Sequence, residues 1–374
     1  MLFPASTPPR NKGTANTAPA YRYGANLAIF GVARFIRRLN CTVAVHFMAN
    51  LYVFICSVIS MATVGVKAVD VIDFFPDVGD DLSKITWGHA INDKDLLQSS
   101  IDNSTIMMLE ADVSPGRLIG QSPDDPHIPI MAHPPYETSN LSLEMWIDEV
   151  IKANENGKNK GAKLDFKSLS IVKYSLELLR NRTERITFPL WLNADILKGP
   201  VGSSRTPVDA DKFLALCTEY FPQATLSVGW TTQYSEEDKP GAYTKEMVEE
   251  MTATLEKNNI TQPITFPIRA AFVGESLENL EWLLDSIPDS TITIWSSESD
   301  KIEVLDLITL RDNVGEDAVY VDLPEEQMKE FEEAKNGGEG NGAVGFQLLP
   351  SNVSVWVTTG VAIATALAAL YLYD

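Results

Sequence analysis

The sequence predicts an α/β protein built around a single (β/α)₈ barrel, the TIM-barrel fold. Two observations predict this fold. Through the middle of the chain, segments with the hydrophobic period of a strand alternate with segments that have the period of a helix, and eight strand segments can be counted. Polar residues recur where these strand segments end, which is the rim where a barrel collects its functional groups. An open, doubly wound sheet is the alternative fold that the same alternation permits.

The predicted elements follow one another along the chain. The strand segments are Ile85–Ala90, Ile106–Val113, Ile128–His133, Ala162–Lys167, Phe188–Ile196, Ala224–Thr231, Ile264–Phe272 and Thr291–Trp295. The clearest helical segments between them are Ser142–Ala153, Leu169–Arg180, Asp209–Phe221, Thr244–Lys257 and Leu277–Ser286. A further strand-like segment, Ala318–Leu323, follows the eighth strand, and we expect it to pack outside the closed barrel. We assign residues 69–330 to the barrel.

The N-terminal residues 1–68 predict export from the cytoplasm. Basic residues around Arg34–Arg38 precede an apolar stretch from Thr42 to Val66, which is the pattern of a signal peptide. Met48 is an alternative start that gives a more conventional signal, and the apolar run is also long enough to remain as a signal anchor. Basic residues before the stretch and acidic residues after it place the rest of the chain in the lumen or outside the cell. We therefore expect the secretory pathway, and the extracellular space or the outer face of the plasma membrane.

Two further features agree with an extracellular location. Acceptor sequons for N-glycosylation begin at Asn103, Asn140, Asn181, Asn259 and Asn352. Residues 331–352, rich in glycine, predict a flexible linker, and residues 353–373 form a continuous apolar run. Small residues, a short spacer and a terminal hydrophobic tail match a signal for a GPI anchor, while the length also permits one transmembrane helix. Either reading predicts attachment to a membrane through the C-terminal segment.

Composition and charge limit the function. Hydrophobic residues make up 45% and charged residues 22% of the 374-residue chain, as in ordinary globular proteins. The formal net charge of −21 argues against a nucleic-acid partner, because it would repel a phosphate backbone. Among the three cysteines only Cys217 lies in the barrel region, so neither a disulfide framework nor a zinc site can be built there. Its helical surroundings predict a buried structural thiol.

Charged residues spaced two apart mark the ends of the predicted strands. Glu110 and Asp112 share one face of a strand, as do Asp165 and Lys167 on another. Lys163 lies on that same face, Asn193 and Asp195 show the same spacing, and the positions between all these residues are apolar. The polar faces should therefore point into the barrel. Such groups are costly to bury unless they form ion pairs or bind a cation, and both readings remain open.

These residue types fit a metal-dependent site for phosphate chemistry. Glu110, Asp112 and Asp165 supply hard oxygen ligands that suit Mg²⁺ or Ca²⁺. His89 and His133 end two strands and could donate and accept protons on either side of a scissile bond. Lys167 could balance the charge of a bound phosphate. The residues predicted to contact the substrate are Lys163, Asn193, Asp195, Trp230 and Arg269.

These segments also carry a family resemblance that covers about Ile85 to Leu323. The motifs are Trp87-Gly-His-Ala-Ile-Asn92, Glu110-Ala-Asp-Val113, Pro129-Ile-Met-Ala-His-Pro-Pro135, Lys163-Leu-Asp-Phe-Lys167, Trp191-Leu-Asn-Ala-Asp195 and Leu226-Ser-Val-Gly-Trp-Thr-Thr232. In this order they are similar to the menorin family. Menorin domains in turn resemble glycerophosphodiester phosphodiesterases and sphingomyelinases D, which are barrels of the phospholipase-C-like phosphodiesterase type.

The resemblance implies roles for the same residues. It implies catalytic histidines at His89 and His133, metal carboxylates at Glu110, Asp112 and Asp165, and an active-site lysine at Lys167. Two positions depart from the pattern. The Arg-Gly that follows the first histidine in glycerophosphodiesterases is here Ala90-Ile91, and the Asp that often follows the second is Pro134. The departures bear on the glycerophosphodiester substrate rather than on the metal site.

Two functions follow as expectations. The first is a metal-dependent phosphodiesterase or phospholipase-like enzyme that acts outside the cell on a phosphodiester or a lipid headgroup. The second is a non-catalytic extracellular interaction protein that acts with cell-adhesion partners, because menorin family members are associated with such complexes.

Overall fold

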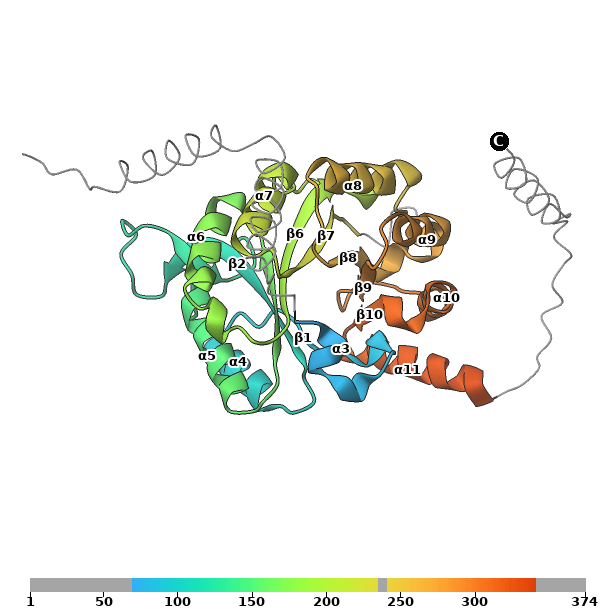
Figure 1. The fold of residues 1–374 in the computed structure, drawn as a ribbon, viewed down its shortest axis with the longest axis horizontal. Coiled ribbons are helices and arrows are strands. Elements are labelled where there is room, and N and C mark those ends of the chain that lie inside the picture. The colour runs from blue at the N-terminus through green and yellow to red at the C-terminus, as the bar shows by residue number, and fades with distance from the viewer. Residues whose placement is uncertain (1–68, 235–240, 341–374) are drawn as a thin grey trace, which may run out of the picture. The chain divides into compact units, whose positions relative to one another are not determined.

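Eight parallel strands form a strongly curved sheet at the centre of the molecule (Figure 1). The computed structural model describes residues 69–234 and 241–340. The strands of the curved sheet, in spatial order, are β1 (Trp87–Gly88), β2 (Met108–Leu118), β5 (Gly161–Phe166), β6 (Leu190–Lys198), β7 (Thr225–Thr231), β8 (Ile264–Arg269), β9 (Thr291–Trp295) and β10 (Val319–Asp322). At the two ends of the sheet, the Trp87 ring lies 6.3 Å from that of Tyr320. The sheet is therefore a nearly closed barrel.

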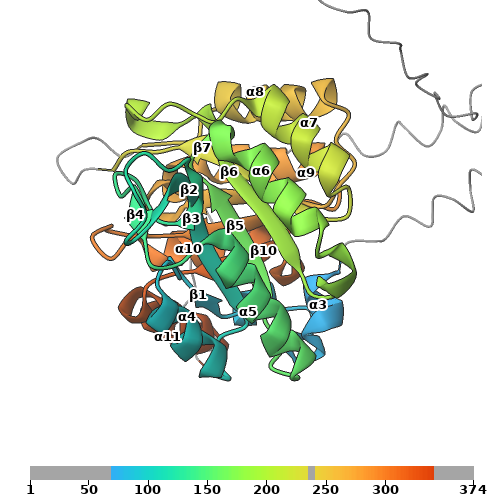
Figure 2. The same ribbon diagram turned by 90° about the vertical axis from the view of Figure 1, so that its left-hand side faces the viewer.

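Helices cover the outside of this barrel (Figures 1 and 2). They are α4 (Lys94–Asp102), α5 (Leu143–Glu155), α6 (Leu169–Arg180), α7 (Ala210–Tyr220), α8 (Lys245–Lys257), α9 (Leu277–Ser286), α10 (Val304–Val314) and α11 (Glu325–Gly340). The side chains of Ser142, Ser168 and Asp209 accept backbone hydrogen bonds at the starts of α5, α6 and α7. All the predicted helical segments are confirmed as helices.

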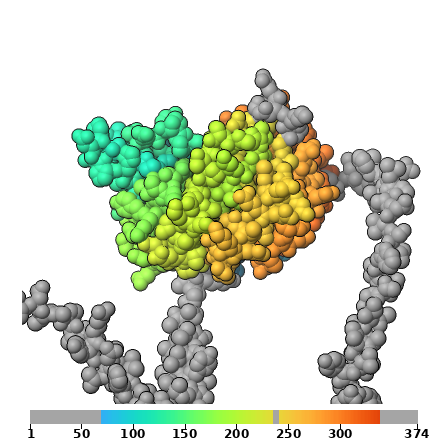
Figure 3. All heavy atoms as spheres, turned by 90° about the horizontal axis from the view of Figure 1, so that it is seen from above, coloured from blue at the N-terminus to red at the C-terminus, as the bar shows by residue number. Residues whose placement is uncertain are grey.

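The third predicted strand has a different place from the one expected. Ile128–His133 contributes β3 (Ile128–Met131), which pairs antiparallel with β2 and lies outside the path of parallel strands. Only residues 119–127 join β2 to β3, and a parallel crossover needs about a dozen residues or more. The two strands therefore form a hairpin, which stands away from the barrel (teal in Figures 1 and 3). A short strand, β4 (Thr138–Ser139), also pairs with the far end of β2.

The segment expected to lie outside the barrel supplies the missing strand. Within Ala318–Leu323, β10 pairs parallel with β9 and completes the set of eight, so the predicted packing outside the barrel was wrong. The intervening helix α10 provides the crossover that a parallel pair requires. The predicted linker from residue 331 was also wrong over its first part, because α11 continues to Gly340.

The N-terminal end of the barrel is covered by the chain that leads into it. This segment contains α3 (Val71–Phe74), η1 (Pro76–Val78) and η2 (Leu82–Lys84). Its apolar residues Val71, Phe75 and Leu82 are buried together with Trp191 and Tyr320 of the strands. The opposite end of the barrel carries the polar residues described below.

The helix-facing side of the sheet confirms the alternation read from the sequence. Leu109, Leu164 and Leu192 are fully buried in the core between strands and helices, and so is the Cys217 thiol. No helix within residues 69–234 and 241–340 is long and apolar enough to cross a membrane. The predicted export signal, the C-terminal anchor and the sequon at Asn352 lie outside the described residues.

Candidate active site at the carboxyl ends of the strands

A cavity of about 270 Å³ opens at the carboxyl ends of the strands. Its lining includes most of the polar residues singled out in the sequence, namely His89, Glu110, Asp112, His133, Lys163, Asp165, Lys167, Asn193, Asp195 and Arg269. Most of them lie on or just after parallel strands of the sheet, which end at the same rim, whereas His133 follows the antiparallel strand β3.

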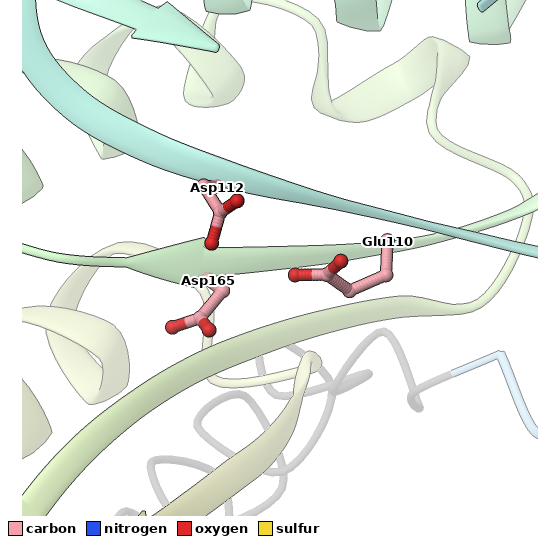
Figure 4. A group of neighbouring side chains, drawn as sticks. All are labelled: Glu110, Asp112 and Asp165. Carbon is pink, nitrogen blue, oxygen red and sulfur yellow. The ribbon is translucent and has the colours of Figure 1, made fainter. Parts of the chain in front are cut away.

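Three carboxylates meet in this cavity. Glu110 and Asp112 lie on β2, and Asp165 lies opposite Asp112 on the neighbouring strand β5. One carboxylate oxygen from each side chain lies within 4.8 Å of the others, and Figure 4 shows the three groups turned toward one another. Glu110 and Asp112 are only 2% and 4% exposed. Hard oxygen ligands at this separation suit a divalent cation such as Mg²⁺ or Ca²⁺.

Lys167 forms ion pairs with two of these carboxylates. Its Nζ lies 2.9 Å from Asp112 Oδ1 and also pairs with Asp165 Oδ2. Burial disfavours the ammonium charge, but the attraction of Asp165 and Asp112 outweighs it and holds the pKa of Lys167 above its usual range. Lys167 therefore forms a satisfied ion-pair group with Asp112 and Asp165, which is one of the two interpretations that the sequence left open. Glu110 differs, because it has no ammonium partner within 4.0 Å among the described residues.

Burial raises the pKa of two carboxyl groups in the cavity, Glu110 and Asp195. Burial raises the pKa of Glu110 above its usual range, and the neighbouring Asp112 adds to the increase against the opposing effect of His89. Burial also raises the pKa of Asp195, with repulsion from Asp165 as the next cause. At both carboxyls burial outweighs the attraction of nearby cationic side chains, which include His89 and Lys163 at Glu110 and Lys167 and Arg205 at Asp195. A bound dication would favour the charged carboxylates further.

His89 lies at the end of β1 and bridges the two ends of the sheet. Its Nδ1 is 3.1 Å from Asp322 Oδ2 on β10 and 3.8 Å from Glu110 Oε2. Burial opposes the charge on the ring, but Glu110 and Asp322 outweigh burial and raise the pKa of His89 to about 9. The side chain is 54% exposed, so water screens part of this attraction. Nε2 remains for a ligand when Asp322 holds Nδ1.

The loop after His89 is tied to the carboxylates. The Ala90 N–H donates to Glu110 Oε2 at 2.7 Å. The Asn92 amide donates to Asp112 Oδ2 at 2.7 Å and accepts from the Asp112 N–H at 2.9 Å. The loop therefore fixes the orientation of two candidate ligands, which is the role of outer partners in metal sites.

His133 reaches the cavity from the hairpin. It follows β3, and the N–H of the preceding Ala132 donates to the Asp112 carbonyl at 3.0 Å, which holds the strand end against β2. Its Nδ1 lies 2.6 Å from the Pro134 carbonyl oxygen. The sequence predicted His133 at the end of a barrel strand. In the structure it follows the antiparallel strand β3 instead, but it reaches the same rim of the barrel.

Four of the five residues predicted to contact substrate line the cavity. Lys163, Asn193 and Asp195 line the cavity. Arg269 also lines it, but its guanidinium makes two 2.7 Å hydrogen bonds to Asp300 and stacks 5.1 Å from the Trp295 ring centroid. Arg269 is thus held by its own protein neighbours.

Trp230 does not line the cavity. Its ring packs 5.2 Å from that of Tyr243 and 6.2 Å from that of Phe266, within the core outside the sheet. The neighbouring Gly229 lies opposite Asp195 in the register and takes the inward position, so strand alternation turns Trp230 outward.

Sequence reasoning missed one cavity residue, Arg205, and two residues that support the cavity, Asp322 and Asn92. Asp322 was missed because its strand was placed outside the barrel, although a polar residue at a strand end was the available signal. Asn92 and Arg205 lie in loops, which carry no periodic pattern. Arg205 lines the cavity and makes no ion pair within the described part of the chain.

The fold and the site together define a nearly closed parallel α/β barrel with a charged cavity at the carboxyl ends of its strands, in which three carboxylates cluster. The family model described as the Menorin N-terminal domain matches residues 81–328. Human Protein FAM151B is 41% identical over 255 residues, which cover 68% of this chain and 88% of that protein. The chain therefore belongs to the menorin family.

Solved structures show more distant similarity. A Rubisco-like protein from Rhodopseudomonas palustris has a TM-score of 0.39 at 11% identity and covers 74% of this chain and 70% of its own. An oxaloacetate acetylhydrolase in complex with oxalate has a TM-score of 0.39 at 10% identity, and the match covers 82% of this chain and 96% of that protein.

Proposed function

We propose that the protein is a phosphodiesterase of the phospholipase-C-like type that depends on Mg²⁺ or Ca²⁺. The observation that carries this proposal is the meeting of Glu110, Asp112 and Asp165 within 4.8 Å, on a rim that also holds His89 and His133. A bound dication would relieve the repulsion among the carboxylates and offset charge that develops on phosphoryl oxygens. Glu110, Asp112 and Asp165 would be its protein ligands.

The two histidines supply the proton transfers. One removes a proton from the attacking oxygen of water or of a substrate hydroxyl as that oxygen forms a bond to phosphorus. The other gives a proton to the leaving oxygen as its bond to phosphorus breaks. Water yields a phosphomonoester and an alcohol, and an internal hydroxyl yields a cyclic phosphodiester and an alcohol. Lys167 keeps Asp112 and Asp165 in place and adds positive charge beside the phosphate.

The test is hydrolysis of dibutyl phosphate, measured as released butanol, by the full-length protein with each cation, because the alkoxide leaving group needs a proton from the general acid. The variants His89→Ala and His133→Ala should each lower turnover by about 10²-fold or more, since general acid–base catalysis is typically of that size. His127→Ala is the matched control, because His127 is exposed on the hairpin and does not line the cavity. Turnover that survives both active-site substitutions contradicts the proposal, and metal binding without turnover favours the non-catalytic interaction protein.

We also propose that this chemistry takes place outside the cell, on a chain attached to the membrane by its C-terminal segment. The apolar runs near both ends of the sequence support this location, as do sequons at the exposed residues Asn103, Asn181 and Asn259. A GPI-cleaving phospholipase applied to intact cells should release the protein. Retention after this treatment would favour a transmembrane helix in place of a GPI anchor.

A further inference from the structure

A second cavity of about 230 Å³ adjoins the first. The two cavities share a wall of five charged or titratable residues, which are His133, Asp165, Lys167, Asp195 and Arg205. A ligand group held at this wall can therefore extend into both cavities.

Outside the shared wall, the second cavity is lined by three apolar residues, Pro134, Phe166 and Val208, and by two threonines, Thr206 and Thr231. Phe166 and Val208 are buried residues. The Val208 N–H donates to the Asp195 carbonyl at 2.9 Å, which fixes this part of the wall to β6. Thr231 also lines the cavity, is 2% exposed, and has a hydroxyl with no hydrogen-bond partner among the described residues.

The first cavity offers the opposite surroundings. Apart from the shared wall it is lined by polar groups such as Glu110, Asn193 and Lys163. Lys163 is 4% exposed, and its ammonium makes no hydrogen bond or ion pair within the described residues, although it lies 5.5 Å from the Trp87 ring centroid. A buried ammonium in this position favours a polar or anionic ligand group.

We infer that the site binds asymmetric phosphodiesters, with the phosphoryl group at the shared wall, a polar arm in the first cavity and a short apolar arm in the second. This inference rests on the proposed function and names its substrate class. At about 30 Å³ for each water-sized group, the second cavity holds roughly eight such groups, which is the size of a phenyl ring or a short alkyl chain.

The test measures binding, so that it does not depend on turnover. Phenyl phosphate and methyl phosphate carry the same phosphate group and differ only in the arm. Calorimetry on the full-length protein with Mg²⁺ or Ca²⁺ should show phenyl phosphate binding at least about tenfold more tightly than methyl phosphate, because its arm buries more apolar surface.

Two substitutions of Val208 change the size of the second cavity in opposite directions. Val208→Phe should remove the preference for phenyl phosphate by filling the cavity. Val208→Ala should instead enlarge the cavity and improve the binding of 1-naphthyl phosphate relative to phenyl phosphate. This variant tests the cavity even if Val208→Phe does not fold. Thr309→Val is a control on the exposed face of α10, and it should leave the preference unchanged.

Several results would overturn the inference. These are equal affinity of the wild type for both monoesters, no binding of either, or Val208 variants that weaken both ligands equally. A preference for phenyl phosphate in a protein that hydrolyses no phosphodiester would support the second cavity and contradict the proposed function, so the two failures are distinguishable.

Discussion

The pairing of His89 with Asp322 predicts a specific change in the titration of the histidine. Asp322→Asn removes the carboxylate that lies 3.1 Å from Nδ1 and leaves Glu110 in place at 3.8 Å. Because the His89 side chain is 54% exposed, a water-like dielectric applies, in which two unit charges at 3.1 Å attract by about 1.3 kcal/mol. That energy corresponds to about one pKa unit. The pKa of His89 should therefore fall from about 9 to about 8.

The sign of the effect on stability follows from the same shift. The folded-state pKa of His89 lies above the ordinary value of 6.5, so the charged ring stabilises the fold fully below pH 6.5, and this stabilisation is lost as the pH rises through about 9. Asp322→Asn should lower the upper end of this pH range.

The assay is a pH titration of the His89 ring signal by NMR in metal-free protein. The matched control is Asp317→Asn, at an exposed position shortly before β10. A titration midpoint for His89 that is the same in wild type and Asp322→Asn would refute the pairing across the ends of the sheet.

Two further predictions concern the scaffold. Trp230→Ala should lower the free energy of unfolding by about 3–5 kcal/mol, because the ring packs in the core between the strands and the helices. The same substitution should leave metal affinity unchanged, and altered metal affinity in a folded variant would contradict this placement. Asp81→Asn should lower the free energy of unfolding in urea by about 3 kcal/mol, because buried Asp81 pairs with Arg311 at 3.2 Å. Glu155→Gln is the control in an exposed ion pair and should change the free energy of unfolding much less. Burial opposes the charge of Asp81, but the Ser83 hydrogen bond and the attraction of Lys335 outweigh it and lower its pKa, so this contribution should be present above about pH 4 and lost as the pH falls further.

The sequence was sufficient to predict the barrel and the strands that carry the carboxylates. Glu110, Asp112 and Asp165 could be placed on inward faces because the period of a strand is two, and this local rule holds wherever the helix-facing side is apolar. Loop and hairpin geometry could not be predicted in the same way. The pattern of Ile128–Met131 predicts a strand but does not tell whether it pairs parallel or antiparallel with its neighbour. The short connection to β2 makes the pairing antiparallel.

Contacts between distant segments were the other missing information. Asp322 reaches His89 across 233 positions of sequence, and no local pattern reports such a contact. Trp230 shows the limit of a motif, because its neighbour Gly229 takes the inward position and the large side chain turns to the core. The pairing of Lys167 with both Asp112 and Asp165 also depends on the alignment of two strands.

Calorimetric titration of the purified full-length protein with Mg²⁺, Mn²⁺ and Ca²⁺ tests the central claim most directly. The three clustered carboxylates predict one bound cation per chain, and Glu110→Gln should weaken its binding by about tenfold or more because a charged ligand is lost. Glu149→Gln, a substitution of the same kind at a half-exposed position of α5 away from the cavity, should leave the affinity unchanged. Absence of binding of all three cations, or equal affinity in wild type and Glu110→Gln, would contradict the assignment of a metal site.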